Sequence, residues 1–135
     1  MPVEVSMAPA HASMEPGLTA RYVLFTVGDV EYGVAATCVS RQLQVGEPSR
    51  TRTLDLRDAF RLPNATEPRP MLVVNGERGE VALLVDELLD GADIDGSAVQ
   101  ELPAAFGGAE RHWFRGLARL GDRLVILVDV DGLLS

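Results

Sequence analysis

The chain has 135 residues, 47% of them hydrophobic, which is enough for one domain with a buried core and excludes an intrinsically disordered protein. Its formal net charge is −8 and all twelve basic residues are Arg, so it lacks the clustered cations expected of a general nucleic-acid-binding protein. The single Cys38 excludes an internal disulfide, and neither a leader pattern nor an apolar run near the roughly 20 residues of a membrane span is present, which indicates a cytoplasmic protein without membrane insertion.

The first predicted elements follow an N-terminal tail. Residues 1–20 are rich in Pro, Ala, Ser and Met with no periodic pattern, so we expect a flexible tail before a single domain over residues 21–135. Residues 22–27 and 30–34 are rich in β-branched and aromatic side chains. The Gly28-Asp29 pair between them suits a two-residue turn, so the pattern predicts a β-hairpin.

The next stretch contains an ambiguous segment and a helical turn. Between residues 35 and 45, Val39 and Leu43 are spaced in a way that favours one face of a short helix over an alternating strand. Residues 54–60 place apolar side chains at helical spacing and are followed by Pro63. This pattern predicts one or two helical turns that end before the proline.

A second hairpin is predicted near the middle of the chain. Residues 71–74 and 81–85 are apolar runs on either side of a turn, 75–79, that contains Asn and Gly. An acidic, Gly-containing turn over residues 90–96 follows it. A weaker strand signal over residues 99–102 ends at a proline, and the small residues after it are expected to be flexible.

The last hairpin is the strongest signal in the chain. Residues 114–120 and 124–128 flank Gly121-Asp122, and the second arm is apolar on both faces, as in a central strand covered on two sides. Alternation in the first arm predicts one core face and one partly wet face. The core face holds Phe114, Gly116, Ala118 and Leu120, and the other face holds Arg115, Leu117 and Arg119. Residues 130–134 close the chain as a short apolar hook.

These elements together predict the fold class. Three hairpins with little helix between them are typical of an all-β fold built from small barrels. No segment between the strands is long enough for the helical crossover of a parallel α/β sheet.

The side chains that could act in catalysis form no recognisable catalytic site. His112 and Cys38 lack partners at ligand or nucleophile spacing, and no phosphate- or dinucleotide-binding glycine motif is present, so we expect neither enzyme activity nor a cofactor. Asp86, which ends a strand, is expected to cap a turn. One alternative is a small acidic β-barrel that binds a metal or another ligand, and another is a domain that self-associates through an unpaired strand edge. The ligands of the metal-binding alternative would be Asp86, Asp90, Asp93 and Asp95.

Four short patterns occur in a fixed order along the chain. They are Tyr22-x-x-Phe25-x-x-Gly28-x-x-x-Tyr32, Asp55-Leu56-Arg57 leading to Leu62-Pro63, Leu84-Val85-Asp86-Glu87, and the closing segment Gly116 to Leu134. Together they resemble CheW-like domains, which are chemotaxis coupling proteins and also form the regulatory domain of the CheA histidine kinase. The resemblance covers the chain outside the N-terminal tail.

The resemblance implies two intertwined, five-stranded SH3-like barrels with a hydrophobic groove between them. In this family the groove grips the cytoplasmic hairpin tip of a methyl-accepting chemotaxis receptor. The same proteins pair with the regulatory domain of a CheA-type kinase or with other CheW-like proteins, and no catalysis or cofactor belongs to the family. The function to expect is therefore a non-enzymatic adaptor in a bacterial chemosensory pathway that couples a receptor to a kinase.

The chain departs from the family pattern before Asp55. CheW-like domains usually carry there a strand reading Gly-Val-x-Asn-Leu-Arg-Gly, whereas here Val45 leads through a polar segment directly into residues 54–56. One barrel is therefore expected to be truncated, as in the small CheW-like proteins of the Frz-type system of gliding bacteria, and at least one usual interface is expected to be weakened. A Glu that the family often has shortly after the position of Val39 is also missing, since Ser40-Arg41-Gln42 stands there.

The residues expected to contact a partner match or flank the groove-facing regions of the family. They are Val39, Leu43, Val45, Val85, Phe114, Gly116 and Leu117. The receptor tip is the first partner to expect from the resemblance, ahead of the kinase.

Overall fold

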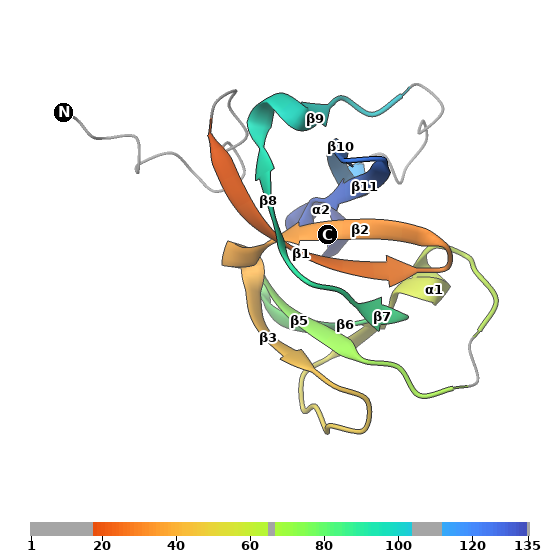
Figure 1. The fold of residues 1–135 in the computed structure, drawn as a ribbon. Coiled ribbons are helices and arrows are strands. Elements are labelled where there is room, and N and C mark those ends of the chain that lie inside the picture. Colours follow the sequence, from red (N-terminus) through yellow and green to blue (C-terminus); the bar gives the residue numbers. More distant parts are fainter. Residues whose placement is uncertain (1–17, 65–66, 104–111, 135) are drawn as a thin grey trace.

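The computed structural model describes residues 18–64, 67–103 and 112–134. Within these ranges the fold consists of two β-sheets and a few short helical segments (Figure 1), which confirms the predicted all-β class. Most of the expected N-terminal tail and the expected flexible segment after Pro103 lie outside the described residues. The first strand begins at Thr19, two residues before the expected start of the domain.

The first sheet combines strands from both ends of the described chain. They are β1 (Thr19–Val27), β2 (Val30–Ala35), β7 (Glu87–Leu88), β8 (Ala92–Asp95), β9 (Val99–Gln100), β10 (Phe114–Leu120) and β11 (Arg123–Val128). The strand order is β7-β1-β2-β11-β10-β9, and β8 also pairs with β1. β11 runs parallel to β2 and antiparallel to β10, so it is a central strand, as its apolar sequence predicts.

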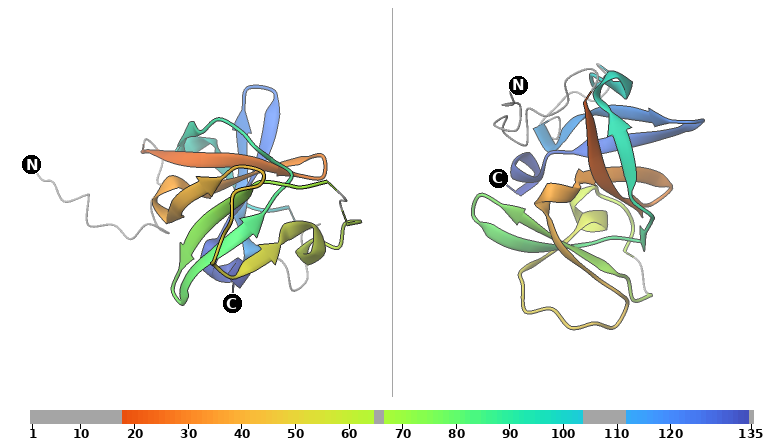
Figure 2. Two further views of the ribbon diagram at one scale, coloured as in Figure 1. Left: turned by 90° about the horizontal axis from the view of Figure 1, so that it is seen from below. Right: turned by 60° about the vertical axis from the view of Figure 1, so that its left-hand side comes forward.

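The second sheet has four strands in the described chain, in the order β3-β5-β6-β4. They are β3 (Val39–Leu43), β4 (Thr53–Asp55), β5 (Met71–Gly76) and β6 (Gly79–Leu84), of which β4 alone runs parallel to its neighbour. The helical segments are the 3₁₀ turns η3 (Ala36–Cys38) and η4 (Gly96–Ala98) and the helices α1 (Leu56–Ala59) and α2 (Val130–Leu134). The segment between β3 and β4 projects as a long loop at the lower end of the molecule (Figure 2, right).

The three predicted hairpins are all present. They pair β1 with β2, β5 with β6, and β10 with β11. Gly28 and Gly121 open their turns at φ 65° and 63°, a backbone conformation that glycine adopts without the steric cost of a Cβ. The helical turn predicted within residues 54–60 is also present as α1, and Asp55 caps it by accepting a hydrogen bond from the Arg57 amide at 3.0 Å.

The predicted helical face within residues 35–45 is wrong. After the single turn η3 the chain forms the strand β3, which pairs with β5. The pairing with β5 selects the strand, and a β-bulge between Val39 and Arg41 places Val39 against the main core and Leu43 in a cluster on the other face of the sheet. The residues between Val39 and Leu43 are polar and exposed because β3 is an edge strand, so the segment lacks the alternation of apolar and polar residues that indicates a strand.

The predicted placement of Phe114 beside Ala118 and Leu120 is also wrong. A β-bulge lies between Phe114 and Gly116, and it shifts the side chain of Phe114 to the opposite face of β10. Phe114 therefore packs against the main core, whereas Ala118 and Leu120 belong to a second hydrophobic cluster. Leu117, predicted on the partly wet face, is buried.

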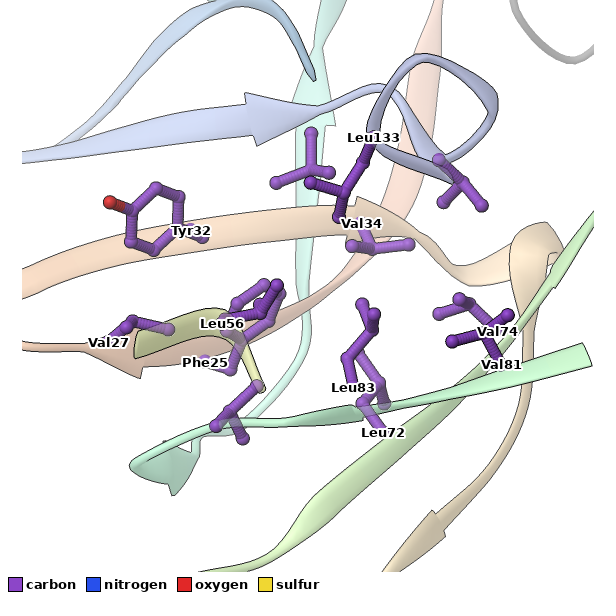
Figure 3. Packing of buried hydrophobic residues seen from close by; sticks show 13 residues of the cluster. Phe25, Val27, Tyr32, Val34, Leu56, Leu72, Val74, Val81, Leu83 and Leu133 are labelled. Carbon is purple, nitrogen blue, oxygen red and sulfur yellow. The ribbon is translucent and has the colours of Figure 1, made fainter. Parts of the chain in front are cut away.

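The main hydrophobic core lies between the two sheets. Figure 3 shows Tyr32 and Val34 of β2 facing Leu72 and Leu83 of the second sheet, with Leu56 of α1 beside them. A second cluster, which includes Tyr22, packs on the other side of the first sheet. The third cluster, on the other side of the second sheet, has three buried members among the described residues, Leu43, Val73 and Ala82. Each sheet thus helps to enclose a cluster of its own in addition to the shared core, and the cluster of the second sheet is the smallest.

Candidate interaction site

Four charged side chains meet where the two sheets join. Arg57 on α1 donates from Nε and Nη2 to the two carboxylate oxygens of Asp86, both at 2.8 Å. Arg69, in the segment before β5, donates to both oxygens of Asp55 at 3.1 and 2.7 Å, and its Nη1 lies 3.6 Å from Asp86 Oδ1. The Asp86 side chain is 16% exposed and that of Asp55 is 29% exposed, so this group, called here the Asp86 network, is a partly buried set of bidentate ion pairs.

The Asp86 network also links the two sheets. The backbone N–H of Gly28, in the β1–β2 turn of the first sheet, donates to Asp86 Oδ2 at 2.8 Å. Asp86 follows β6 of the second sheet, and its own N–H donates to the carbonyl oxygen of Thr26 at 2.9 Å. The expected turn-capping role of Asp86 therefore holds for a turn that is far away in the sequence. The contacts of Asp86 with Arg57 and with the Gly28 amide give the Asp-Leu-Arg and Leu-Val-Asp-Glu patterns a structural role in this chain, which is to hold the two sheets together.

The network lowers the pKa of both aspartates. Burial alone would raise the pKa of the Asp86 carboxyl, but the hydrogen bonds from Arg57 and from the Gly28 amide outweigh it, so the pKa lies below its ordinary value. The hydrogen bond from Arg69 is the main cause of the lowered pKa of Asp55. Both carboxylates therefore stay charged at neutral pH.

This electrostatic arrangement predicts how stability depends on pH. A carboxyl whose pKa is lower in the folded than in the unfolded state stabilises the fold above its unfolded pKa of about 3.9, and this contribution is lost as the pH falls through the folded value. We expect the free energy of unfolding, measured in urea, to decline below about pH 4. The decline should be shallower in Asp86→Asn than in the unchanged chain, and identical slopes would contradict a linked carboxylate.

Aromatic side chains gather beside α1. Phe60, which ends α1, lies 5.2 Å from Tyr32, 5.8 Å from Trp113 and 5.9 Å from Phe114, measured between ring centroids. These rings lie along the edge of the main core, and Trp113 and Phe114 are only half-buried. Phe60 therefore joins the segment before β10 to α1 and so to the Asp86 network.

The expected partner-contacting residues do not form one continuous exposed surface. Val45 is 53% exposed, and Val39 and Phe114 are half-buried at the edge of the main core. The other four, Leu43, Val85, Gly116 and Leu117, are buried. Val85 has no exposed surface, so its place is in the core of this chain and not on its surface.

Gly116 has a structural reason to be glycine. A Cβ added there would lie 2.5 Å from the backbone carbonyl oxygen of Gln100 on β9, because the two strands approach closely beyond the bulge. Gly116 therefore permits the close packing of β10 against β9.

Two surface features were not predicted from the sequence. Val30 and Leu124 are exposed large hydrophobic residues, and they precede the register pair Glu31–Val125 on the parallel strands β2 and β11, so they lie side by side. Val30 directly follows the Gly28-Asp29 turn and starts β2, and Leu124 is the second residue of β11, so closeness to the two Gly-Asp turns was the available signal. The second feature is a cavity of about 380 Å³ between the β5–β6 turn and α2, lined in part by Arg52, Arg78 and Asp131. None of the expected contact residues lines it.

The aspartates of the metal-binding alternative are spread over different interactions. Asp86 is held by Arg57, Asp93 forms an exposed ion pair with Arg21 at 3.4 Å, and Asp95 accepts a hydrogen bond from the Ser97 amide at 2.8 Å. In the part of the chain that the structure describes, His, Cys, Asp and Glu form no group of three or more that could hold a metal ion.

The geometry defines a class of protein: a small all-β domain in which two sheets share a core and each helps to enclose its own cluster, consistent with two SH3-like barrels. The sequence model of the CheW-like domain matches residues 49–135, more than half of the chain. The chain therefore belongs to the CheW-like family of coupling and scaffolding proteins in chemotaxis signalling, and the expected fold class is confirmed.

The fold agrees with a solved structure. The crystal structure of the scaffolding protein TtCheW from Thermoanaerobacter tengcongensis superposes with a TM-score of 0.71, covering 86% of this chain and 92% of that chain, at 15% sequence identity. No curated protein sequence matches the chain. Among the described helices, none has the length and hydrophobicity to cross a membrane.

Proposed function

We propose that this chain is a non-enzymatic, cytoplasmic adaptor that couples a methyl-accepting chemotaxis receptor to a CheA-type histidine kinase. The observation that carries the proposal is the match of the CheW-like family over residues 49–135. The arrangement of two sheets around a shared core supports the proposal, because it is consistent with the two barrels between which this family grips the receptor tip. The adaptor acts by binding its partners differently in different receptor states.

The receptor contact is proposed at the three expected residues that keep exposed surface, Val39, Val45 and Phe114. Val39 and Phe114 both lie at the edge of the main core, so a partner helix that packs there would extend the core outward. Gly116 and Leu117 are buried residues of β10, the strand that Phe114 begins, and Val85 is a member of the main core. Leu43 belongs to the third cluster.

We also propose that the second sheet is a shortened barrel and that one of the usual interfaces is weakened by it. That sheet ends in β4, a strand of three residues, and its own cluster has three buried residues. Receptor binding is the interface proposed to persist, and binding to the kinase regulatory domain or to another CheW-like protein is the weaker one.

A binding experiment tests the receptor site. We expect a peptide that reproduces the receptor's helical hairpin tip to bind the full chain in titration calorimetry, and Val45→Glu to raise its dissociation constant at least tenfold, since burying an uncompensated charge costs more than about 1.4 kcal/mol. Leu124→Glu is the matched control, because Leu124 is equally exposed but lies near the turn of the β10–β11 hairpin, at the opposite end from Phe114. It should leave binding unchanged.

The kinase regulatory domain is measured in the same assay. Measurable binding that is much weaker than that of other CheW-like proteins is the expected result. Failure of both the receptor peptide and the kinase domain to bind would reject the adaptor function.

A further inference from the structure

We propose that the edge strand β3 is a second docking site, which takes an extended acidic segment of a partner protein as an added strand. β3 pairs with β5 along one side, and no strand in the described ranges pairs with its other side. Ser40, Arg41 and Gln42, the middle of the strand, are exposed. A free strand edge offers a row of backbone N–H and C=O groups to an extended peptide.

The charge around β3 selects an acidic partner. Residues 39–54 carry three arginines and one glutamate, a net charge of +2, in a chain whose formal net charge is −8. Arg41 Nη2 lies 3.4 Å from the hydroxyl oxygen of Thr51, so Thr51 and the exposed Arg50 next to it lie near the Arg41 side chain. Arg52 lies farther from β3, where its carbonyl oxygen accepts a hydrogen bond from the Ala82 N–H on β6. A second copy of this chain would bring the same arginines to the edge, and like charges across paired strands repel. A negatively charged partner is therefore favoured over self-association.

The present contacts of Arg41 are weak enough to be exchanged. Arg41 pairs in register with Val73, a member of the third cluster, so its side chain lies over the face of the second sheet that carries this cluster. From there it reaches Glu80 at 3.5 Å and Thr51 at 3.4 Å, and the Arg41 side chain is still 47% exposed. Exposed ion pairs of this length add little stability, so a carboxylate of an incoming strand can replace Glu80.

The partner's expected chemistry follows from these neighbours. An added strand places alternate side chains on opposite faces, so a segment with acidic residues at every second position presents all of them to one face. That face meets Arg41, with the exposed Arg50 nearby. The backbone pairing supplies affinity for an extended chain, and the arginines supply the preference for acidic side chains.

A labelled peptide that alternates valine and glutamate, about nine residues long so that it spans β3, is the direct probe. We expect saturable binding to the full chain by fluorescence anisotropy, weakened by added salt, and new hydrogen-exchange protection confined to Val39–Leu43. A peptide that alternates valine and lysine should not bind.

Arg41→Glu should raise the dissociation constant of the Val/Glu peptide at least about tenfold. Arg123→Glu is the matched control, because Arg123 is 50% exposed and forms an ion pair of the same 3.5 Å length, with Glu31, but on β11 of the first sheet. It should leave binding unchanged, and melting temperatures check that both variants fold.

The following results would overturn the proposal: no saturable binding, equal binding of the lysine peptide, equal loss in Arg123→Glu, or protection at another strand. A dimer of the chain alone with β3 protected would assign the edge to a second copy instead. Loss of Val/Glu binding while the receptor peptide still binds would reject this site alone, so the two proposals can fail separately.

Discussion

Changing Asp86 to alanine is expected to lower the free energy of unfolding by about 3 kcal/mol. The change removes the carboxylate that pairs with the partly buried Arg57, whereas Arg69 keeps its pair with Asp55. It also removes the acceptor of the Gly28 amide, which joins the β1–β2 turn to the second sheet. Removing one partner of a buried ion pair costs about 3–5 kcal/mol, and the remaining exposure of Asp86 places this site at the lower end of that range.

The matched control is Asp93→Ala. Asp93 also pairs with an arginine, Arg21, but the two side chains are 60% and 59% exposed and the atoms are 3.4 Å apart. An exposed pair of this kind contributes at most about 1 kcal/mol. Urea unfolding of both variants measures the difference directly. Equal costs for the two changes would show that the Asp86 network does not stabilise the fold.

A double-mutant cycle isolates the pair itself. Arg57→Ala and Asp86→Ala share one interaction, so their combined cost should be smaller than the sum of the single costs by about 1–3 kcal/mol. Arg57 also donates to the carbonyl oxygen of Pro63 at 2.9 Å, a contact that the Asp86 change leaves in place. Additive costs would mean that the two residues stabilise the domain independently.

The sequence predicts best what is decided locally. The three hairpins follow from turn residues and the apolar runs beside them, since a Gly-Asp pair favours the same turn wherever it occurs. The central position of β11 follows in the same way from its apolar character on both faces. The helical turn α1 needed only the spacing of its apolar residues and the proline after it.

The errors have a common physical cause, which is pairing between distant strands. A helix and an edge strand compete for the segment around Val39, and only β5, some thirty residues later, decides between them. A bulge reversed the face of Phe114, and bulges leave no dependable mark in a single sequence. The burial of Val85 and Leu117, two of the expected contact residues, depends in the same way on how the sheets pack together.

The Asp86 network could not be predicted from the sequence, because it also depends on contacts between distant parts of the chain. Its arginines and aspartates were visible, but Arg57 and Asp86 are separated by 29 residues and Gly28 and Asp86 by 58. Local spacing cannot join them. The family resemblance marked the motifs that contain Arg57 and Asp86 without assigning them to each other.

Replacing Gly132 by alanine is expected to lower the free energy of unfolding by about 2–3 kcal/mol, because the new methyl group meets backbone and not a flexible side chain. A Cβ at Gly132 would lie 1.9 Å from the carbonyl oxygen of His112. The surrounding backbone cannot yield easily, since the Asp129 N–H donates to the carbonyl oxygen of Trp113 at 2.8 Å and fixes α2 against this segment. α2 must therefore shift away, and the buried Leu133 that anchors it in the main core shifts with it.

The control for Gly132→Ala is Gly121→Asn. Gly121 has open space around the position of a Cβ and a φ of 63°, a conformation that asparagine tolerates, so this change should cost less than about 1 kcal/mol. Urea unfolding compares the two variants. α2 also lies beside β5 (Figure 2), so its displacement would reach the second sheet and loosen both barrels together. If Gly132→Ala proved as mild as Gly121→Asn, the apolar hook at residues 130–134 would not be packed against the segment before β10, and the main core would have to close without it.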